Sequence, residues 1–241
     1  LAEFQSSYCT KRTRVSALLQ SIIDSQHNKS QLVFMSQDFL NPFTEIDQHG
    51  GKLPYWQQDE ALQFVTFRLK DSVPTSKLRE WANYRKQWLL RHPQPWDSKT
   101  QSDYHCEFSL PFESWLDRGY GECILKDSGN RQILSEIFMH DQNIRVTHLA
   151  WINMPNHVHL LFKPLYPLAQ LIKTWKGVSA RKIGNGSIWQ RNYRDTIIRN
   201  PEHRLRVLRY IRKNPSKLSS SQFTLWESDE ARCLLKEGAH S

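Results

Sequence analysis

The chain has 241 residues, of which 39% are hydrophobic and 12% aromatic, and it carries a formal net charge of +9. This length and composition suit one large globular domain with a substantial core. No stretch approaches the roughly 20 apolar residues that a membrane-spanning helix needs, and no leader typical of a signal peptide is visible. The cysteines are scattered and form no Cys-x-x-Cys pair, which favours free thiols in a reducing cytoplasm. They are Cys9, Cys106, Cys123 and Cys233.

The positive charge is concentrated in one part of the chain. From Asp141 to Lys217 there are fifteen Lys and Arg and three acidic residues, a net charge of +12, so the remainder has a net charge of −3. A basic field of this density favours a polyanionic partner, most simply nucleic acid. A basic surface that serves only solubility is the alternative, but it does not explain why the charge gathers in one segment.

Residues 1–52 are expected to form an N-terminal extension of unknown role. Leu18, Leu19, Ile22 and Ile23 have the spacing of one helical face, whereas Leu40–Gly51 has the composition of a loop. The first strand is predicted over Phe64–Leu69, where aromatic and β-branched residues alternate with polar ones.

A helical region follows this strand. We expect helices over 76–92 and 102–118, the second bent near Pro111, and another amphipathic helix around Ile133–Phe138. These helices make up a predicted insertion of about residues 70–142 within a domain that spans 53–226.

A β-hairpin is predicted next. Ile144–Asn153 and His157–Lys163 read as strands, and Met154-Pro155-Asn156 reads as the turn between them. Side chains two apart on a strand share a face, so His157 and His159 leave the sheet together and make half of a metal site. Two polar residues on a solvent-facing strand are the alternative reading.

A second half of that site is predicted on a later helix. A helix that Pro167 opens and two short extended pieces, Ile188–Gln190 and Thr196–Ile198, precede it. Asn200-Pro201-Glu202 is a helix start, and Tyr210 stands one turn before Asn214 near the helix end. If this helix crosses the histidine face, Asn214 supplies a third ligand and Tyr210 lies beside the metal. An ordinary interface tyrosine and an ordinary helix terminator remain the alternatives.

His157-Val158-His159 after Met154-Pro155-Asn156, then Trp189-Gln190-Arg191, then Tyr210-Ile211-x-x-Asn214-Pro215 resemble, in order and content, the motifs of single-tyrosine HUH transposases. The chain looks most like the REP-associated tyrosine transposases, which act on short repeated hairpin elements. The resemblance implies an α+β fold, with helices packed on the faces of a ferredoxin-like antiparallel sheet. It makes His157, His159 and Asn214 metal ligands and Tyr210 the nucleophile. Residues 227–241 are then a C-terminal tail.

The implied activity is cleavage and rejoining of single-stranded or hairpin, REP-like DNA through a 5′-phosphotyrosine, with Mg²⁺ or Mn²⁺ as cofactor. The implied protein is a monomer or homodimer in the bacterial cytoplasm, associated with the nucleoid and not with a membrane. Tyr193 is the second candidate nucleophile. A hairpin-binding regulator that does not cut, and a metal nuclease that uses water, are the rival functions.

Basic side chains of two helices and of the segment between them are candidates for phosphate contacts. They are Lys173, Lys176, Arg181, Lys182, Arg191, Arg194, Arg206, Arg209, Arg212 and Lys213. Trp175, Trp189 and Tyr193 are candidates for stacking on bases, with burial in the core as the alternative for each.

Overall fold

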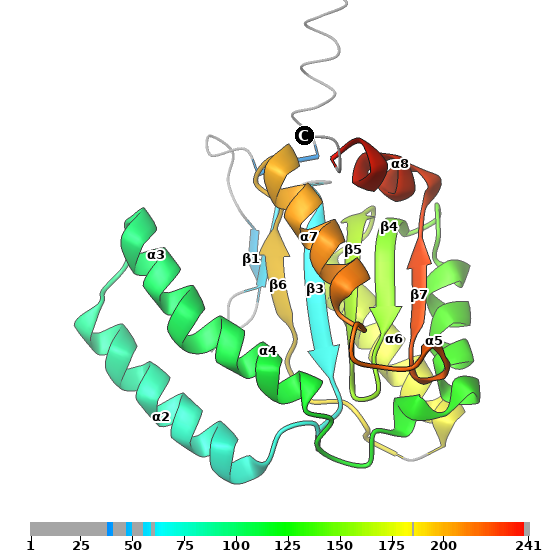
Figure 1. The fold of residues 1–241 in the computed structure, drawn as a ribbon, viewed down its shortest axis with the longest axis horizontal. Helices are drawn as coiled ribbons and strands as arrows, with labels where there is room; N and C mark the ends of the chain where they lie inside the picture. Colours follow the sequence, from blue (N-terminus) through cyan, green and yellow to red (C-terminus); the bar gives the residue numbers. More distant parts are fainter. Residues whose placement is uncertain (1–37, 41–46, 50–54, 59–60, 185, 239–241) are drawn as a thin grey trace, which may run out of the picture.

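A five-stranded antiparallel sheet forms the centre of the protein (Figure 1). A computed structural model of the chain describes residues 38–40, 47–49, 55–58, 61–184 and 186–238. In the order in which they lie across the sheet, the strands are β6 (Arg194–Ile197), β3 (Gln63–Arg68), β5 (His157–Pro164), β4 (Val146–Asn153) and β7 (Thr224–Glu227). A separate antiparallel pair joins β1 (Asp47–His49) to β2 (Tyr55–Gln57).

The connectivity of this sheet is ferredoxin-like. Counted along the chain, β3, β4, β5 and β6 lie in the spatial order 4-1-3-2. The two helices that precede β4 and follow β5 are α5 (Ser128–His140) and α6 (Leu168–Ile183). The predicted α+β class, with helices on an antiparallel sheet, is therefore confirmed. Strand β7, which the sequence did not lead us to expect, extends the sheet beside β4.

The two faces of the sheet bury different helices, and β5 shows how the sequence divides them. Val158, Leu160 and Phe162 point into a core cluster that includes residues of α5 and α6. Leu161 points the other way, into a cluster with α7 (Pro201–Lys213) and α8 (Asp229–Glu237). His157 and His159 alternate with the first set, so they leave the sheet on the α7 face.

The helical insertion forms an arm beside the β6 edge of the sheet (Figure 1). It consists of α2 (Thr75–Arg91), α3 (Ser98–Tyr104), a π-helical turn η1 (His105–Ser109) and α4 (Leu110–Asp117). The helix predicted over 102–118 is interrupted by the π-helical turn just before Pro111, which lies in the first turn of α4. Short 3₁₀ turns, η2 (Ile124–Lys126) and η3 (Ser220–Gln222), complete the elements.

Three sequence-based boundaries differ from the structure. The predicted insertion of 70–142 takes in α5, which belongs to the core layer of the sheet. The predicted tail of 227–241 holds α8, whose Ala231 and Leu235 are buried in the α7-side cluster. The expected loop of 40–51 contains β1. The predicted helical face at Leu18–Ile23 lies outside the described residues.

In the part of the chain that the structure covers, every helix is too short or too polar to cross a bilayer. Of the cysteines in that part, Cys123 is buried and Cys106 and Cys233 are exposed, and all three are free thiols.

Candidate metal and tyrosine site

The histidine pair occupies the middle of the α7 face. β3 runs antiparallel to β5, with Thr66 opposite His159 and Arg68 opposite His157. Both histidines are 1% exposed, and their Nε2 atoms lie 3.0 Å apart. They are therefore not a solvent-facing polar pair, which was the alternative reading of the sequence.

Asn156 fixes the tautomer of His157. The Asn156 amide donates from Nδ2 to the carbonyls of Leu116, at 3.1 Å, and Tyr120, at 3.2 Å. Its Oδ1 therefore faces His157 Nδ1, at 2.8 Å, and can only accept. The His157 proton is thus on Nδ1, and the lone pair of Nε2 is directed at His159. An outer hydrogen bond of this kind orients histidine ligands in metal sites.

His159 has a partner that suits either tautomer. The Thr66 hydroxyl lies 2.7 Å from His159 Nδ1, and a hydroxyl can donate or accept. Without a cation, His159 can donate from Nε2 to His157 and accept from Thr66. If a cation bound here, the His159 proton would be on Nδ1, and Nε2 of His157 and Nε2 of His159 could both be ligands.

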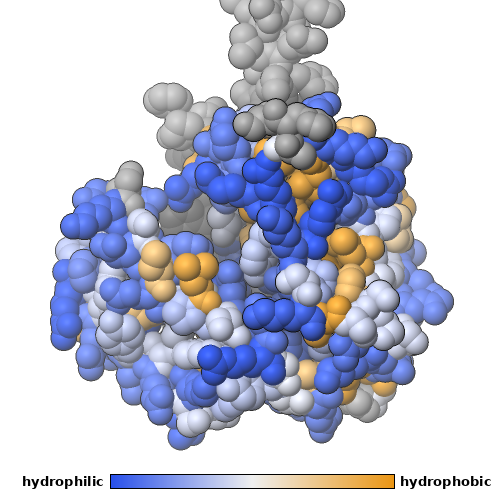
Figure 2. All heavy atoms as spheres, viewed as in Figure 1, coloured by the Kyte–Doolittle hydropathy of each residue, from blue (hydrophilic) through white to orange (hydrophobic). Residues whose placement is uncertain are grey.

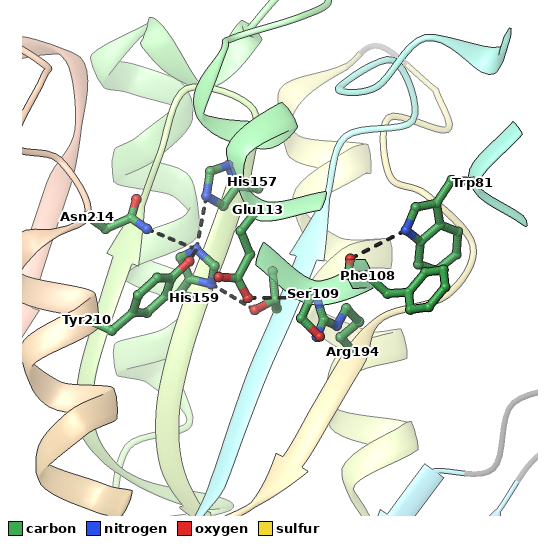
Figure 3. Close-up of polar contacts among 10 residues, drawn as sticks. Trp81, Phe108, Ser109, Glu113, His157, His159, Arg194, Tyr210 and Asn214 are labelled. Atoms are coloured by element: carbon green, nitrogen blue, oxygen red, sulfur yellow. Dashed lines mark hydrogen bonds and ion pairs between the residues drawn. The ribbon is translucent and has the colours of Figure 1, made fainter. Parts of the chain in front are cut away.

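Helix α7 brings the other two predicted residues to this pair (Figure 3). The Asn200 side chain accepts from His203 N and caps the helix, and Pro201 fits its first turn. Val207, Leu208 and Ile211 bury one face against the sheet. The next face then points at the histidines. Tyr210 Oη lies 3.2 Å and Asn214 Nδ2 lies 3.5 Å from His159 Nε2.

Burial keeps the imidazoles neutral. It lowers the pKa of His157 to about 3, and burial together with the neighbouring His157 holds the pKa of His159 well below its usual value. At neutral pH both rings are thus in the uncharged form, with one nitrogen free to bind a metal.

The environment of Tyr210 keeps its phenol neutral as well, by raising its pKa. Burial, and then the carboxylates of Glu113 and Asp117, raise the pKa of Tyr210 above its ordinary value, and Arg194 only partly opposes them. The phenol stays protonated unless positive charge enters the site.

Glu113 and Arg194 complete the surroundings of Tyr210. Glu113 comes from α4 in the insertion, its carboxylate raises the pKa of Tyr210, and it lies 3.8 Å from Arg194 Nη1. Arg194, on β6, also donates to the buried Ser109 hydroxyl at 3.1 Å. The sequence predicts Arg194 as a phosphate contact, and in the structure it also pairs with Glu113 and Ser109 of the insertion. No motif marks Glu113, because its approach depends on how α4 folds back over the sheet.

The residues fit a divalent cation by two observations. The Nε2 atoms of the two neutral imidazoles lie 3.0 Å apart, so both could contact one cation. The Asn214 Oδ1 atom is buried and has no hydrogen-bond partner within the described residues. Turning that amide by 180° directs Oδ1 at the histidines. Within the same residues no three His, Cys, Asp or Glu side chains form a metal-binding group, so the set depends on this amide.

A cavity of about 640 Å³ opens beside His157, Tyr210 and Asn214. We call it the site cavity. Its wall carries six basic side chains and a single acid, Asp117. The basic residues are Arg118, Lys126, Arg206, Arg209, Lys213 and Lys217. Figure 2 shows hydrophilic side chains covering α7 on this side of the molecule.

The predicted phosphate-binding residues divide between two surfaces. Arg206, Arg209 and Lys213, which we call the α7 basic set, line the site cavity. Exposed Lys173, Arg181 and Lys182, the α6 basic set, belong to the helix on the opposite face of the sheet.

Three further predicted contacts have their own positions. Lys176 donates to the carbonyls of residues 190–192 and so holds that segment. Arg212 makes a bidentate ion pair with Glu227 of β7, at 2.9 and 2.7 Å. Arg191 is exposed in the segment that Lys176 holds.

The other aromatic candidates pack in the core opposite α7. Trp175 is 0% and Trp189 6% exposed, so neither is available for stacking on a base. Tyr193 is half-buried against the same cluster, whereas Tyr210 lies beside the histidines.

No protein family model and no curated protein matches the chain. A solved structure of "the REP associates tyrosine transposase bound to a REP hairpin" is similar to it, with 15% sequence identity and a TM-score of 0.39. The match covers 70% of this chain and 74% of that chain. At this level of similarity, the function has to be inferred from the chemistry of the site itself.

Proposed function

We propose that the protein is a metal-dependent enzyme that nicks and rejoins single-stranded or hairpin DNA through a covalent 5′-phosphotyrosine on Tyr210. The observation that carries the proposal is the convergence of the Tyr210 phenol and the Asn214 amide on the buried His157–His159 pair. A protein that only binds DNA needs neither a neutral imidazole pair nor a phenol held against it.

The charge of the site cavity supports the proposed substrate class. Its six basic side chains favour a phosphate backbone. REP-like hairpins are the substrate that the sequence resemblance suggests. We also propose that the protein is a monomer or homodimer in the bacterial cytoplasm. Two imidazole nitrogens and an amide oxygen suit Mn²⁺ and tolerate Mg²⁺, which prefers oxygen ligands.

The proposed chemistry is a reversible phosphoryl transfer. Tyr210 Oη attacks the scissile phosphorus as its proton passes to Glu113. The bond from phosphorus to the 3′ oxygen breaks, and that oxygen leaves as a 3′-hydroxyl after taking up a proton from water. A divalent cation at the histidines would stabilise the charge that develops on the phosphate. The phosphoester energy is retained in the phosphotyrosine, so a 3′-hydroxyl can reverse the step or join a new strand.

Glu113 is the proposed acceptor of the phenol proton. Its carboxylate is close enough to raise the pKa of Tyr210, and burial raises the pKa of its own carboxyl, which makes the carboxylate a stronger base. The protonated carboxyl can then return the proton to Tyr210 when a 3′-hydroxyl attacks the phosphotyrosine.

The test is incubation with end-labelled hairpin and single-stranded DNA in Mn²⁺, followed by denaturing electrophoresis. We expect a labelled protein–DNA adduct that is lost with EDTA and in Tyr210→Phe and that persists in Tyr193→Phe.

Two other outcomes identify the rival functions. Cleavage without any adduct contradicts the proposal in favour of a nuclease that activates water. Binding without cleavage contradicts it in favour of a regulator that retains the fold.

A further inference from the structure

A second cavity, of about 500 Å³, lies between the helical insertion and the sheet. We call it the insertion cavity. Trp81, Phe108 and Phe112 form its aromatic wall, and Thr66, Arg68 and Arg194 line the side of the sheet. In Figure 3 Trp81 and Phe108 lie on the far side of Arg194 from the histidines.

Arg68 is a buried cation without an anionic partner. It is 7% exposed. Its Nη1 donates to Ser72 Oγ at 2.9 Å and to the Leu69 carbonyl at 3.3 Å, and its guanidinium lies over Phe112 at 5.4 Å. Within the part of the chain that the structure describes, no carboxylate pairs with it, and Nε and Nη2 donate to no acceptor. Buried charges are ordinarily paired because desolvation is costly, so these two donors indicate a ligand.

The two Arg68 donors without an acceptor indicate which atoms the ligand presents to them. Nε–H and Nη2–H of a guanidinium are parallel and match two neighbouring acceptors, such as two oxygens of a phosphate or O6 and N7 of guanine. Trp81, the half-buried ring of this wall, favours the flat base, because phosphate gains nothing from an aromatic ring whereas bases stack on one. The Arg85 guanidinium, between Trp81 and Tyr104 at 5.7 and 5.6 Å, adds a second cationic surface for stacking.

The insertion cavity lies next to the proposed active site. Thr66, which hydrogen-bonds His159, and Glu113, whose carboxylate raises the pKa of Tyr210, both line it. Arg68 is also the register partner of His157. A base held here would therefore belong to a nucleotide near the phosphate that Tyr210 attacks.

We propose that the insertion cavity binds one unpaired guanine, with Arg68 donating to O6 and N7 and Trp81 of the insertion stacking on the ring. This inference rests on the proposed function, because it assumes a DNA strand at the histidine site. It makes the insertion the part of the protein that selects a base beside the cleaved bond.

The test measures binding without cleavage, by fluorescence anisotropy of full-length protein with labelled 12-nucleotide oligo(dT) strands. The central position is dT, dG, dA or 7-deaza-dG, the last of which lacks the N7 acceptor. We expect dG to bind about 10-fold tighter than dT, dA and 7-deaza-dG. Arg68→Lys keeps the charge but loses the paired donors, so it should abolish the preference and leave affinity for all-dT nearly unchanged.

Arg131→Lys is the matched control. Arg131 is also buried, at 4% exposed, but its donors are directed at the carbonyls of Leu125, Lys126 and Ser221. This variant should keep the preference for dG. If it loses the preference as Arg68→Lys does, Arg68 has no specific role and the inference is wrong.

The remaining outcomes separate the two proposals. Equal affinity for all four strands, or a dG preference that survives Arg68→Lys, overturns the guanine site and leaves the proposed nicking activity standing. A preference that 7-deaza-dG retains also overturns the assigned contact. Failure to bind any of these strands and hairpin DNA contradicts the proposed function itself.

Discussion

Replacing Asn156 with Ala should weaken metal binding although Asn156 is not a ligand. The change removes the acceptor that holds the His157 proton on Nδ1, at 2.8 Å. His157 is then free to carry its proton on Nε2, where it blocks the metal. Loss of an outer hydrogen bond of this kind typically costs 10- to 100-fold in metal affinity, equivalent to about 1.4–2.7 kcal/mol.

The same substitution should also destabilise the fold. Asn156→Ala deletes the hydrogen bond to His157 and the two to the carbonyls of Leu116 and Tyr120. At a net 0.5–1.5 kcal/mol each, the expected loss is about 2–4 kcal/mol of unfolding free energy. Metal affinity must therefore be measured on protein shown by circular dichroism to be folded.

Asn153→Ala is the matched control. Asn153 is equally buried, at 0% exposed, and donates to the Arg131 carbonyl and the Ser135 hydroxyl, both at 3.3 Å. It should lose comparable stability and keep its metal affinity. The assay is titration with Mn²⁺ followed by electron paramagnetic resonance of the free ion. Unchanged affinity in Asn156→Ala, or equal weakening in both variants, refutes the role assigned to the Asn156–His157 hydrogen bond.

Burial lowers the pKa of His148 to about 4 from an ordinary 6.5, so the unfolded chain binds more protons between these values. The contribution of His148 to the unfolding free energy should be fully present above pH 6.5 and should fall towards pH 4 by about 1.4 kcal/mol per pH unit. In urea titrations, the unfolding free energy of His148→Gln should therefore depend on pH less steeply by that amount. An unchanged pH dependence counts against a neutral buried His148. Changing the α7 basic set to Gln should reduce the slope of log K against log salt for single-stranded DNA by about 2, at about 0.7 per contact. Changing the α6 basic set to Gln should leave that slope unchanged. If the α6 variant lowers the slope and the α7 variant does not, DNA binds on the other face of the sheet. Gly121→Ala should cost about 2–4 kcal/mol, because at φ +86 a Cβ meets the Asp71 carbonyl oxygen at 2.7 Å. Gly184→Ala, with a positive φ but open space, should cost less in the same urea titration, and equal losses would contradict the steric cause.

Much of the core could be predicted because local patterns carry it. The alternation of His157 and His159 with Val158 and Leu160 sets which face the imidazoles share, and a strand allows no other arrangement. The cap at Asn200 and the spacing of Tyr210 and Asn214 similarly place two polar groups on one helix face. What these patterns leave open is whether that helix crosses the histidine face, which depends on long-range packing of Leu208 and Ile211.

The residues that complete the site could not be predicted from the sequence for the same reason. Thr66 and Asn156 act on the histidines through contacts set by strand register and by the hairpin turn. Glu113 and Arg68 come together only because the insertion folds back over the β6 edge. The charge of the α6 basic set predicts phosphate contacts, but charge does not say on which face of a sheet a helix packs.

The attachment site of DNA on the protein tests the central claim most directly. Protein trapped with single-stranded or hairpin DNA in Mn²⁺ is digested with nuclease and protease, and the nucleotide-bearing peptide is identified by mass spectrometry. We predict a nucleotide joined through its 5′ phosphate to Tyr210, with a free 3′-hydroxyl on the released strand. A nucleotide on Tyr193, or cleaved DNA with no modified peptide, would contradict the assignment of Tyr210 as the nucleophile.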